Sequence, residues 1–216
     1  MSFADAVTIP IQGVTGYLLV KEVARVQPFE TVLIQAAAGG VESYLVQLAK
    51  LAGAGTVIAL VGSHDKASFV RQLGADVVIS SNERWADEVL ARTNGRGVDV
   101  VFESASGKLR NQSYELLASS GRVIVYGARN VNDKLSPKQI QQLIFKNQTI
   151  IGFNIPSFDS KRIAAAVPQL MQLISAGRLK LFALSRFPLH RVRDAFKALA
   201  SRRTVGKIVL VPNLLD

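Results

Sequence analysis

Residues 31–51 of the sequence read TVLIQAAAGGVESYLVQLAKL, and this stretch decides the fold class. The apolar run from Val32 to Ile34 is typical of a buried strand, and apolar residues recur at helical spacing from Val41 onward. A turn of small residues, AAAGG, lies between them at positions 36–40. A strand, a small-residue turn and a helix together place backbone N–H groups and a helix N-terminus where a pyrophosphate can bind. The stretch predicts either a nucleotide-binding unit or an ordinary α/β turn of the same composition.

The glycine motif of this turn is incomplete. Against the dinucleotide-binding pattern G-x-G-x-x-G, the three glycine slots hold Ala37, Gly39 and Glu42. Glycine in the third slot normally lets the helix and strand pack closely. A Glu42 side chain that points inward would occupy the anion site, whereas one that points outward would affect only the packing. We expect Glu42 to weaken cofactor binding.

Composition sets the broad class of the protein. The 216 residues are 49% hydrophobic and 19% charged, which is typical of a globular α/β protein. We find no apolar run approaching the roughly 20 residues of a membrane span, and the N-terminus lacks the pattern of a secretory signal. The absence of cysteine excludes disulfides and zinc–thiolate sites, and two distant histidines, His64 and His190, argue against a histidine metal centre. These features predict a cytoplasmic protein without a metal.

The formal charge of +10 is concentrated in the last third of the chain. Residues 1–150 carry 15 basic and 13 acidic side chains, whereas residues 151–216 carry 11 and 3. Such an excess could bind nucleic acid, but most of these basic residues fall on polar faces of expected helices or in turns. No aromatic-and-basic motif for single strands accompanies them. A solvated surface is therefore the favoured interpretation, and we do not expect a nucleic-acid partner.

After a helical lead-in over residues 3–26, interrupted at Pro10, strands and helices alternate along the chain. The expected strands are uniformly apolar rather than alternating, which is typical of strands buried on both faces of a parallel sheet. We expect strands at 32–35, 56–61, 76–79, 98–103, 122–126 and 149–155, and helices at 41–52, 65–73, 84–93, 108–117, 137–145 and 162–175. The order predicts a doubly wound parallel sheet of the Rossmann type, with ligands at the carboxyl ends of the strands.

The chain divides into three expected parts. Residues 1–27 form the lead-in, residues 28–180 form a dinucleotide-binding Rossmann domain, and residues 181–216 form a tail of different character. The tail reads as an extended segment, a helix and a final strand. It looks like part of a neighbouring β-rich unit.

The end of the second expected strand bears on which cofactor binds. NAD sites usually place an acidic residue there to hold the ribose 2′-hydroxyl, but this strand ends in Val61. Ser63 can hydrogen-bond a 2′-phosphate, and Lys66 can supply the opposing charge. Asp65 is discordant, and Ser63 could instead cap the following helix. The pattern predicts NADP rather than NAD.

Further landmarks follow in a fixed order through nearly the whole chain. They are AAAGGV at 36–41, VQLAK at 46–50, VGSHDK at 61–66, LGAD at 73–76, GRGVDVV at 95–101, GRVIVYG at 121–127 and GKIVL at 206–210. On these motifs the chain resembles the cofactor-binding half of the zinc-free medium-chain dehydrogenase/reductase family. Within that family it is most similar to quinone oxidoreductases and to the enoyl reductase domains of polyketide and fatty acid synthases.

The resemblance implies NADPH-dependent hydride transfer to a quinone, or to a carbon–carbon double bond conjugated to a carbonyl in a small-molecule or carrier-bound enoyl substrate. It also implies the cofactor-binding residues. These are Gly39, Gly40 and Val41 at the pyrophosphate, Ser63 and Lys66 at the 2′-phosphate, Ser104 near the adenosine or pyrophosphate, and Tyr126, Gly127, Ala128, Phe153 and Asn154 at the nicotinamide. Thr15 and Tyr17 are weaker candidates. For Tyr126 and Phe153, ordinary core packing is the alternative role.

Two further expectations follow from the resemblance. The GroES-like catalytic domain that precedes this half in the family has no counterpart here, and the tail 181–216 would be the remnant that joins it. That domain usually supplies the groups that orient the substrate and protonate the product, so no catalytic residue is assigned. We expect either an excised piece of a larger enzyme or a natural truncation, and a homodimer that pairs through Thr149–Ile155. The competing hypothesis is a non-catalytic module that dimerises or binds RNA.

Overall fold

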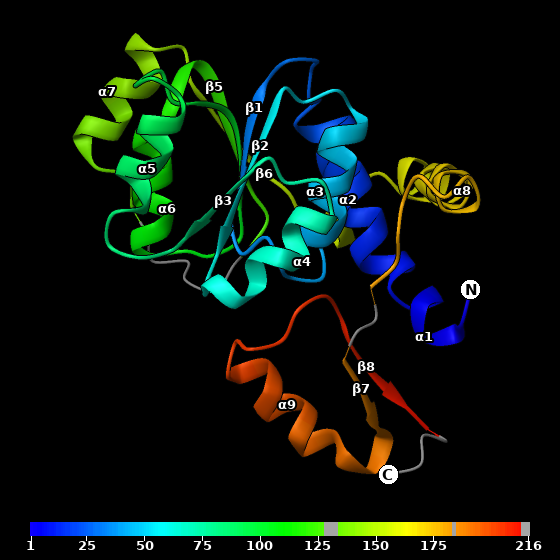
Figure 1. Ribbon diagram of the computed structural model, residues 1–216. Helices are drawn as coiled ribbons and strands as arrows, with labels where there is room; N and C mark the ends of the chain where they lie inside the picture. The colour runs from blue at the N-terminus through cyan, green and yellow to red at the C-terminus, as the bar shows by residue number, and fades with distance from the viewer. Residues whose placement is uncertain (128–133, 183–184, 213–216) are drawn as a thin grey trace.

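A computed structural model describes residues 1–127, 134–182 and 185–212. At its centre lies a six-stranded parallel sheet with the strand order β3-β2-β1-β4-β5-β6 (Figure 1). The strands are β1 (Thr31–Ile34), β2 (Thr56–Val61), β3 (Val77–Ser80), β4 (Val98–Glu103), β5 (Leu117–Val125) and β6 (Thr149–Gly152). The order reverses between β1 and β4, so the crevice outside their carboxyl ends is the expected ligand position. The predicted doubly wound parallel sheet is confirmed.

Helices cover both faces of the sheet, which therefore has two cores. Successive residues of β1 pack into different cores, because Val32 and Ile34 face one side of the sheet and Leu33 faces the other. One face is covered by α2 (Val14–Leu18), α3 (Glu42–Leu51), α4 (Ala67–Gln72) and α8 (Ser160–Ser175). The opposite face is covered by α5 (Trp85–Arg92) and α6 (Lys108–Glu115), with α7 (Pro137–Phe145) beside α6 in Figure 1. Burial on both faces explains why the strands read as continuous apolar runs.

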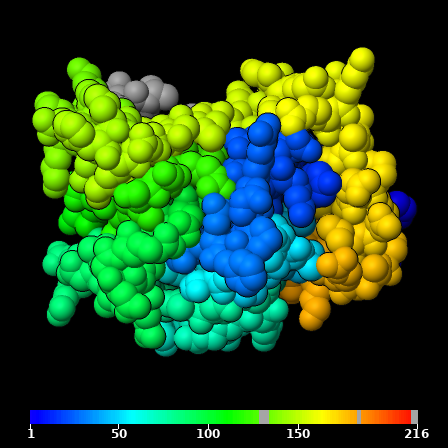
Figure 2. Space-filling model, turned by 90° about the horizontal axis from the view of Figure 1, so that it is seen from above, coloured from blue at the N-terminus to red at the C-terminus, as the bar shows by residue number. Residues whose placement is uncertain are grey.

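The lead-in is helical through Pro10, where the sequence predicted an interruption. It runs from α1 (Phe3–Ala6) through the π-helical segment η1 (Ile9–Gly13) and α2 to a second π-helical segment, η2 (Leu19–Val23). Pro10 lies in the first turn of η1, where a missing backbone N–H breaks no helical hydrogen bond. Viewed from above, the blue lead-in lies between the green part of the chain and the yellow α8 region (Figure 2).

One helical stretch, Phe3–Val23, is long and apolar enough to cross a membrane by length and composition. The expectation from the sequence that no apolar run approaches the length of a membrane span is therefore wrong for this stretch. In the structure half of this stretch is buried inside the protein, as in a core helix of a globular domain. The cytoplasmic location expected from the sequence stays a prediction.

The tail forms a small separate sheet. Strands β7 (Ser185–Pro188) and β8 (Ile208–Val211) pair in parallel, with η5 (Leu189–Arg191) and α9 (Val192–Ala200) between them. Figure 1 shows this orange and red unit near the carboxyl ends of the main strands. The backbone N–H of Gly206 donates to the carbonyl oxygen of Ala38 at 2.8 Å, so the tail contacts the glycine turn directly. The division at residues 27 and 180 and the GroES-like origin of the tail stay predictions.

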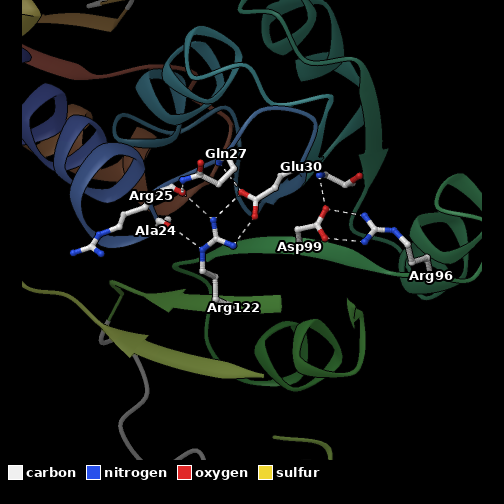
Figure 3. Close-up of polar contacts among 8 residues, drawn as sticks. Ala24, Arg25, Gln27, Glu30, Arg96, Asp99 and Arg122 are labelled. Atoms are coloured by element: carbon white, nitrogen blue, oxygen red, sulfur yellow. Dashed lines mark hydrogen bonds and ion pairs between the residues drawn. The ribbon is translucent and has the colours of Figure 1, made fainter. Parts of the chain in front are cut away.

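Two ion pairs fasten the amino-terminal edge of the sheet (Figure 3). Arg122 of β5 pairs with Glu30 at 2.7 Å and donates to the carbonyl oxygen of Ala24, which ties the end of the lead-in to the sheet. Asp99 of β4 accepts from the backbone N–H of Thr31 and pairs with Arg96. Burial raises the pKa of Asp99, but the bonds from Arg96 and Thr31 outweigh it and hold that pKa below its ordinary value.

The β6 strand ends earlier than predicted. The sequence pattern indicated a strand over 149–155, whereas β6 covers Thr149–Gly152. The N–H of Phe153 still donates to Val125, but a short 3₁₀ turn, η4 (Ile155–Ser157), then begins. Pro156 lies inside this turn and cannot donate to a neighbouring strand.

Candidate functional site

The glycine turn after β1 lies at the point where the strand order reverses. Ala36 has a positive φ of 49°, and the N–H of Gly39 donates to its carbonyl oxygen at 2.8 Å. The N–H of Ala37 donates to Leu60 of β2 at 2.9 Å, which holds the turn against the next strand. Gly39 and Gly40 are partly exposed. The turn thus has the position, and in Gly39 and Gly40 the small residues, that are typical of a dinucleotide-binding turn.

Glu42 points inward, which answers the question that the sequence left open. It is the first residue of α3, and only 8% of it is exposed. Its Oε1 atom accepts hydrogen bonds from the Tyr126 hydroxyl at 2.8 Å and the Ser104 hydroxyl at 3.0 Å. Its Oε2 atom lies only 2.3 Å from the position that a Cβ on Gly39 would take. The carboxylate therefore bridges the turn after β1, the loop after β4 and the end of β5.

The electrostatics of this bridge favour a neutral tyrosine beside a carboxylate. Burial and the negative charge of Glu42 raise the pKa of Tyr126 well above its ordinary value. The phenol therefore stays protonated and can donate to Glu42. The N-terminus of α3 adds a favourable dipole for an acidic side chain, worth about 0.3–1 kcal/mol.

A cleft of about 810 Å³ opens beside this bridge, at the carboxyl ends of β5 and β6. Tyr126, Gly127, Phe153 and Asn154, all assigned to the nicotinamide from the sequence, line it together. Gly127 is required there, because a Cβ would lie 2.5 Å from the carbonyl oxygen of Ser104. Ala128, assigned to the same group, lies outside the described residues.

The two residues assigned to the 2′-phosphate lie where β2 ends, but both have partners in the protein. The Lys66 ammonium is buried and donates to the carbonyl oxygen of Arg202, in the loop between α9 and β8. The Ser63 hydroxyl bonds Asp65 and lowers the pKa of that carboxyl. Ser63 makes no side-chain capping bond to the next helix. Their role toward a phosphate stays a prediction.

The weaker candidates lie elsewhere. Tyr17 lines a separate cleft of about 480 Å³ formed with residues of α3 and α8, and burial raises its pKa. Thr15 is buried within α2. Within the described part of the chain, no group of three or more His, Cys, Asp or Glu could hold a metal ion. That the protein works without zinc is a prediction from the sequence.

A buried ion pair behind the site was missed by the sequence reasoning. Glu103, at the end of β4, is fully buried and accepts from Arg110 of α6 at 2.7 Å. Its other oxygen accepts from the N–H of Ser106, and Arg110 also donates to the carbonyl oxygen of Gly127. The pair thereby joins the loop after β4 to the end of β5. The sequence feature that could have indicated this pair is Glu103 itself, a charged residue at the end of an apolar strand.

A second feature that the sequence did not indicate is a groove between the glycine turn and the tail. It measures about 380 Å³, and apolar residues of α9 and β8 form one wall. Gly40, Val41 and Glu42 form the other wall, together with Gln12. Glu42 therefore borders both the bridge to Tyr126 and this groove.

Comparisons with known proteins agree with this arrangement. The sequence pattern of the zinc-binding dehydrogenase family matches residues 40–176, more than half of the chain. The highly reducing polyketide synthase poxF of Penicillium oxalicum is 30% identical over 98% of the chain, which spans 9% of that synthase. The CurK enoyl reductase is 31% identical with a TM-score of 0.85, over 97% of this chain and 63% of that structure. A mycobacterial protein solved with NADPH is 27% identical with a TM-score of 0.89, over 98% and 66% of the two chains.

The match covers both the sequence order and the fold, although the chain spans less than two thirds of the CurK structure and a tenth or less of the synthases. The part that matches the family pattern contains α3, the strands from β2 to β6 and most of the residues that line the cleft at the carboxyl edge. The chain belongs to the zinc-binding dehydrogenase family of medium-chain dehydrogenases/reductases and corresponds to the nucleotide-binding half of these enzymes.

Proposed function

We propose that this chain is the NADPH-binding half of an oxidoreductase that reduces, by hydride transfer, an enoyl thioester or a quinone. The observation that carries the proposal is that the glycine turn, at the switch point, and the nicotinamide-side cleft, at the ends of β5 and β6, lie along the same carboxyl edge of the sheet. The relatives with printed activities support an enoyl substrate held on a carrier, because they are an enoyl reductase and a polyketide synthase. Zinc-independence and the choice of substrate belong to the same proposal.

The residues at the carboxyl edge leave room for a dinucleotide at its nicotinamide end but not at its centre. The cleft at Tyr126 and Phe153 has room for a nicotinamide ring. Gly127, which has no side chain, lets the backbone at the end of β5 pack closely against Ser104 beside this cleft. At the centre, the inward carboxylate of Glu42 lies where the pyrophosphate would meet the N-terminus of α3. A bound cofactor would supply the hydride, and this chain would contribute its binding and orientation.

Discrimination between NADPH and NADH tests the proposed cofactor. We expect NADPH to bind about tenfold or more tightly, because the 2′-phosphate gains a charge-assisted hydrogen bond at the end of β2. Ser63→Ala is expected to reduce the ratio of the two dissociation constants several-fold, whereas Ser68→Ala, an exposed serine in α4, should leave it unchanged. Titration followed by nicotinamide fluorescence measures both constants. Equal affinities of the wild type for the two nucleotides would contradict the assignment.

We also propose that two copies pair through β6. This strand lies at the edge of the main sheet, with Thr149 and Gly152 exposed, and an edge strand can extend into a second copy. The neighbouring α7 presents Ile144 and Phe145, which are 67% and 81% exposed. Apolar side chains this exposed beside an open edge favour an interface.

Sedimentation analysis tests the pairing. We expect a dimer for the wild type and a monomer for Ile144→Glu, since burying that charge without a partner would disfavour association. Phe29→Glu is the matched control, because Phe29 is 88% exposed in the loop before β1. It should remain dimeric. If the wild type and the Phe29→Glu control are both monomeric, the proposed pairing through β6 is wrong.

A further inference from the structure

We propose that Glu42 is an internal substitute for the cofactor phosphate: its carboxylate holds the crevice together without a nucleotide and has to leave before a pyrophosphate binds. The inference rests on the proposed function, which supplies the ligand, and adds how access to that site is controlled. Its basis is the position, the partners and the surroundings of this one side chain.

The position of Glu42 is the position of a bound anion. It occupies the third glycine slot of the turn and begins α3, a helix of ten residues. Backbone N–H groups and the helix dipole at such an N-terminus attract negative charge. The Oε2 atom lies against Gly39, where a Cβ would approach it to 2.3 Å. A phosphate oxygen approaching the same turn would therefore meet the carboxylate.

The partners of Glu42 are the donors that a phosphate would use. Ser104 and Tyr126 both donate their hydroxyl protons to Oε1, from the ends of β4 and β5. Hydroxyl groups and helix N-termini form strong hydrogen bonds to anionic oxygens. The chain thus satisfies this set of donors internally. Because only 8% of Glu42 is exposed, a second anion there would meet the carboxylate charge with little screening by water.

Tyr126 connects the two ends of the crevice. Its hydroxyl donates to Glu42, while the residue also lines the nicotinamide-side cleft. The next residue, Gly127, packs against the backbone of Ser104, the other donor to Glu42. Release of the carboxylate would therefore free a hydroxyl in each of two adjacent loops. Binding of the pyrophosphate and shaping of the nicotinamide-side cleft would occur together.

The groove toward the tail can accommodate the Glu42 side chain after it leaves the crevice. Glu42 also lines the groove toward the tail, and Lys207 lines the same groove. A rotation of the glutamate side chain toward this groove would bring its charge to the side of the Lys207 ammonium. The groove has a volume of about 380 Å³, which is ample for a carboxylate. The groove therefore offers the displaced carboxylate both space and a positive charge.

Titration with inorganic pyrophosphate tests the inference without requiring the rest of the cofactor. Calorimetry on the full chain would compare the wild type with Glu42→Gln, Glu42→Gly and the control Glu88→Gln, an exposed glutamate in α5. We expect pyrophosphate affinity to rise from wild type to Glu42→Gln to Glu42→Gly, by about tenfold or more overall, because first the charge and then the side chain is removed. The control should match the wild type. Equal pyrophosphate affinity in all four proteins, or none in any of them, would overturn the inference.

Thermal unfolding and NADPH titration of the same proteins separate this inference from the proposed function. Without ligand, Glu42→Gly should unfold at a lower temperature than the wild type, because Ser104 and Tyr126 lose their acceptor. Glu42→Gln keeps an acceptor oxygen and should lower the unfolding temperature less, because it loses only the charge. Glu42→Gln keeps the shape of the side chain and serves if Glu42→Gly does not fold. Tighter pyrophosphate binding without NADPH binding would support the inference and contradict the proposed function. If NADPH binds, and if each ligand binds the wild type and the variants with the same affinity, the result would support the proposed function and contradict the inference.

Discussion

Arg110→Met is expected to lower the free energy of unfolding by about 3–5 kcal/mol, because it removes the guanidinium that pairs with a fully buried carboxylate. Glu103 is completely enclosed at the end of β4 and accepts from Arg110 at 2.7 Å. Methionine fills similar space but donates no hydrogen bond, so the negative charge remains in a medium that solvates it poorly. The bond from Arg110 to the Gly127 carbonyl would be lost as well.

Urea denaturation of Arg110→Met and a matched variant measures this effect. Arg96→Met breaks a pair of similar length, 2.7 Å to Asp99, but the Arg96 side chain is 55% exposed. We expect it to cost less than Arg110→Met does, since water screens the exposed guanidinium and the Asp99 carboxylate keeps the hydrogen bond from the Thr31 N–H. The double variant Glu103→Gln/Arg110→Met should recover part of the loss, because no net charge then stays buried. Similar losses for Arg110→Met and Arg96→Met would show that burial of Glu103 is not the cause.

Gly97→Ala should destabilise the protein by about 3 kcal/mol or more. Gly97 precedes β4 with a φ of 87°, a region that costs other residues about 1–2 kcal/mol. A Cβ there would lie 2.3 Å from the carbonyl oxygen of Leu116, which belongs to the backbone and cannot rotate away. Overpacking of this kind adds about 1–3 kcal/mol. The amino ends of β4 and β5 would have to move apart.

Gly95→Ala separates the two contributions. Gly95 has a similar φ of 77°, but nothing lies within 4 Å of its Cβ position. Only the backbone strain should appear, at about 1–2 kcal/mol. Comparing the denaturation midpoints of the two variants therefore isolates the steric term at Gly97. If both glycines cost the same, the close approach to Leu116 has no energetic consequence and the explanation is wrong.

Most strands of the sheet could be predicted because each is a short, continuous run of apolar residues in the sequence. The predicted bounds of the strands at 56–61 and 98–103 match β2 and β4, whose apolar runs are buried on both faces. β5 was predicted to begin at residue 122 but begins at Leu117. The first part of β5 contains Ser119, Ser120 and Gly121, a composition typical of a turn. Pairing of Leu117 with Val98 across a register shift outweighs that local preference.

The sequence could place several candidate site residues near one another, but it could not predict their geometry. Residues at the ends of parallel strands converge, so Tyr126, Gly127 and Phe153 could be placed together from their strand positions. The direction of Glu42 could not, because its partners Ser104 and Tyr126 are 62 and 84 positions away in the sequence. The same holds for Lys66, whose acceptor is 136 positions away. Local patterns cannot contain contacts that only the folded chain creates.

The loop between α9 and β8 sets a practical limit on how this protein can be shortened. Through the bonds of Gly206 to Ala38 and of Lys66 to Arg202, this late segment completes the walls around the glycine turn and the end of β2. A portable cofactor-binding module excised at residue 180 would lose the acceptor of Lys66 and expose apolar surface around Phe69, which stacks edge-on against Phe182. Any graft or fusion built from this chain should therefore retain its sequence at least through Lys207.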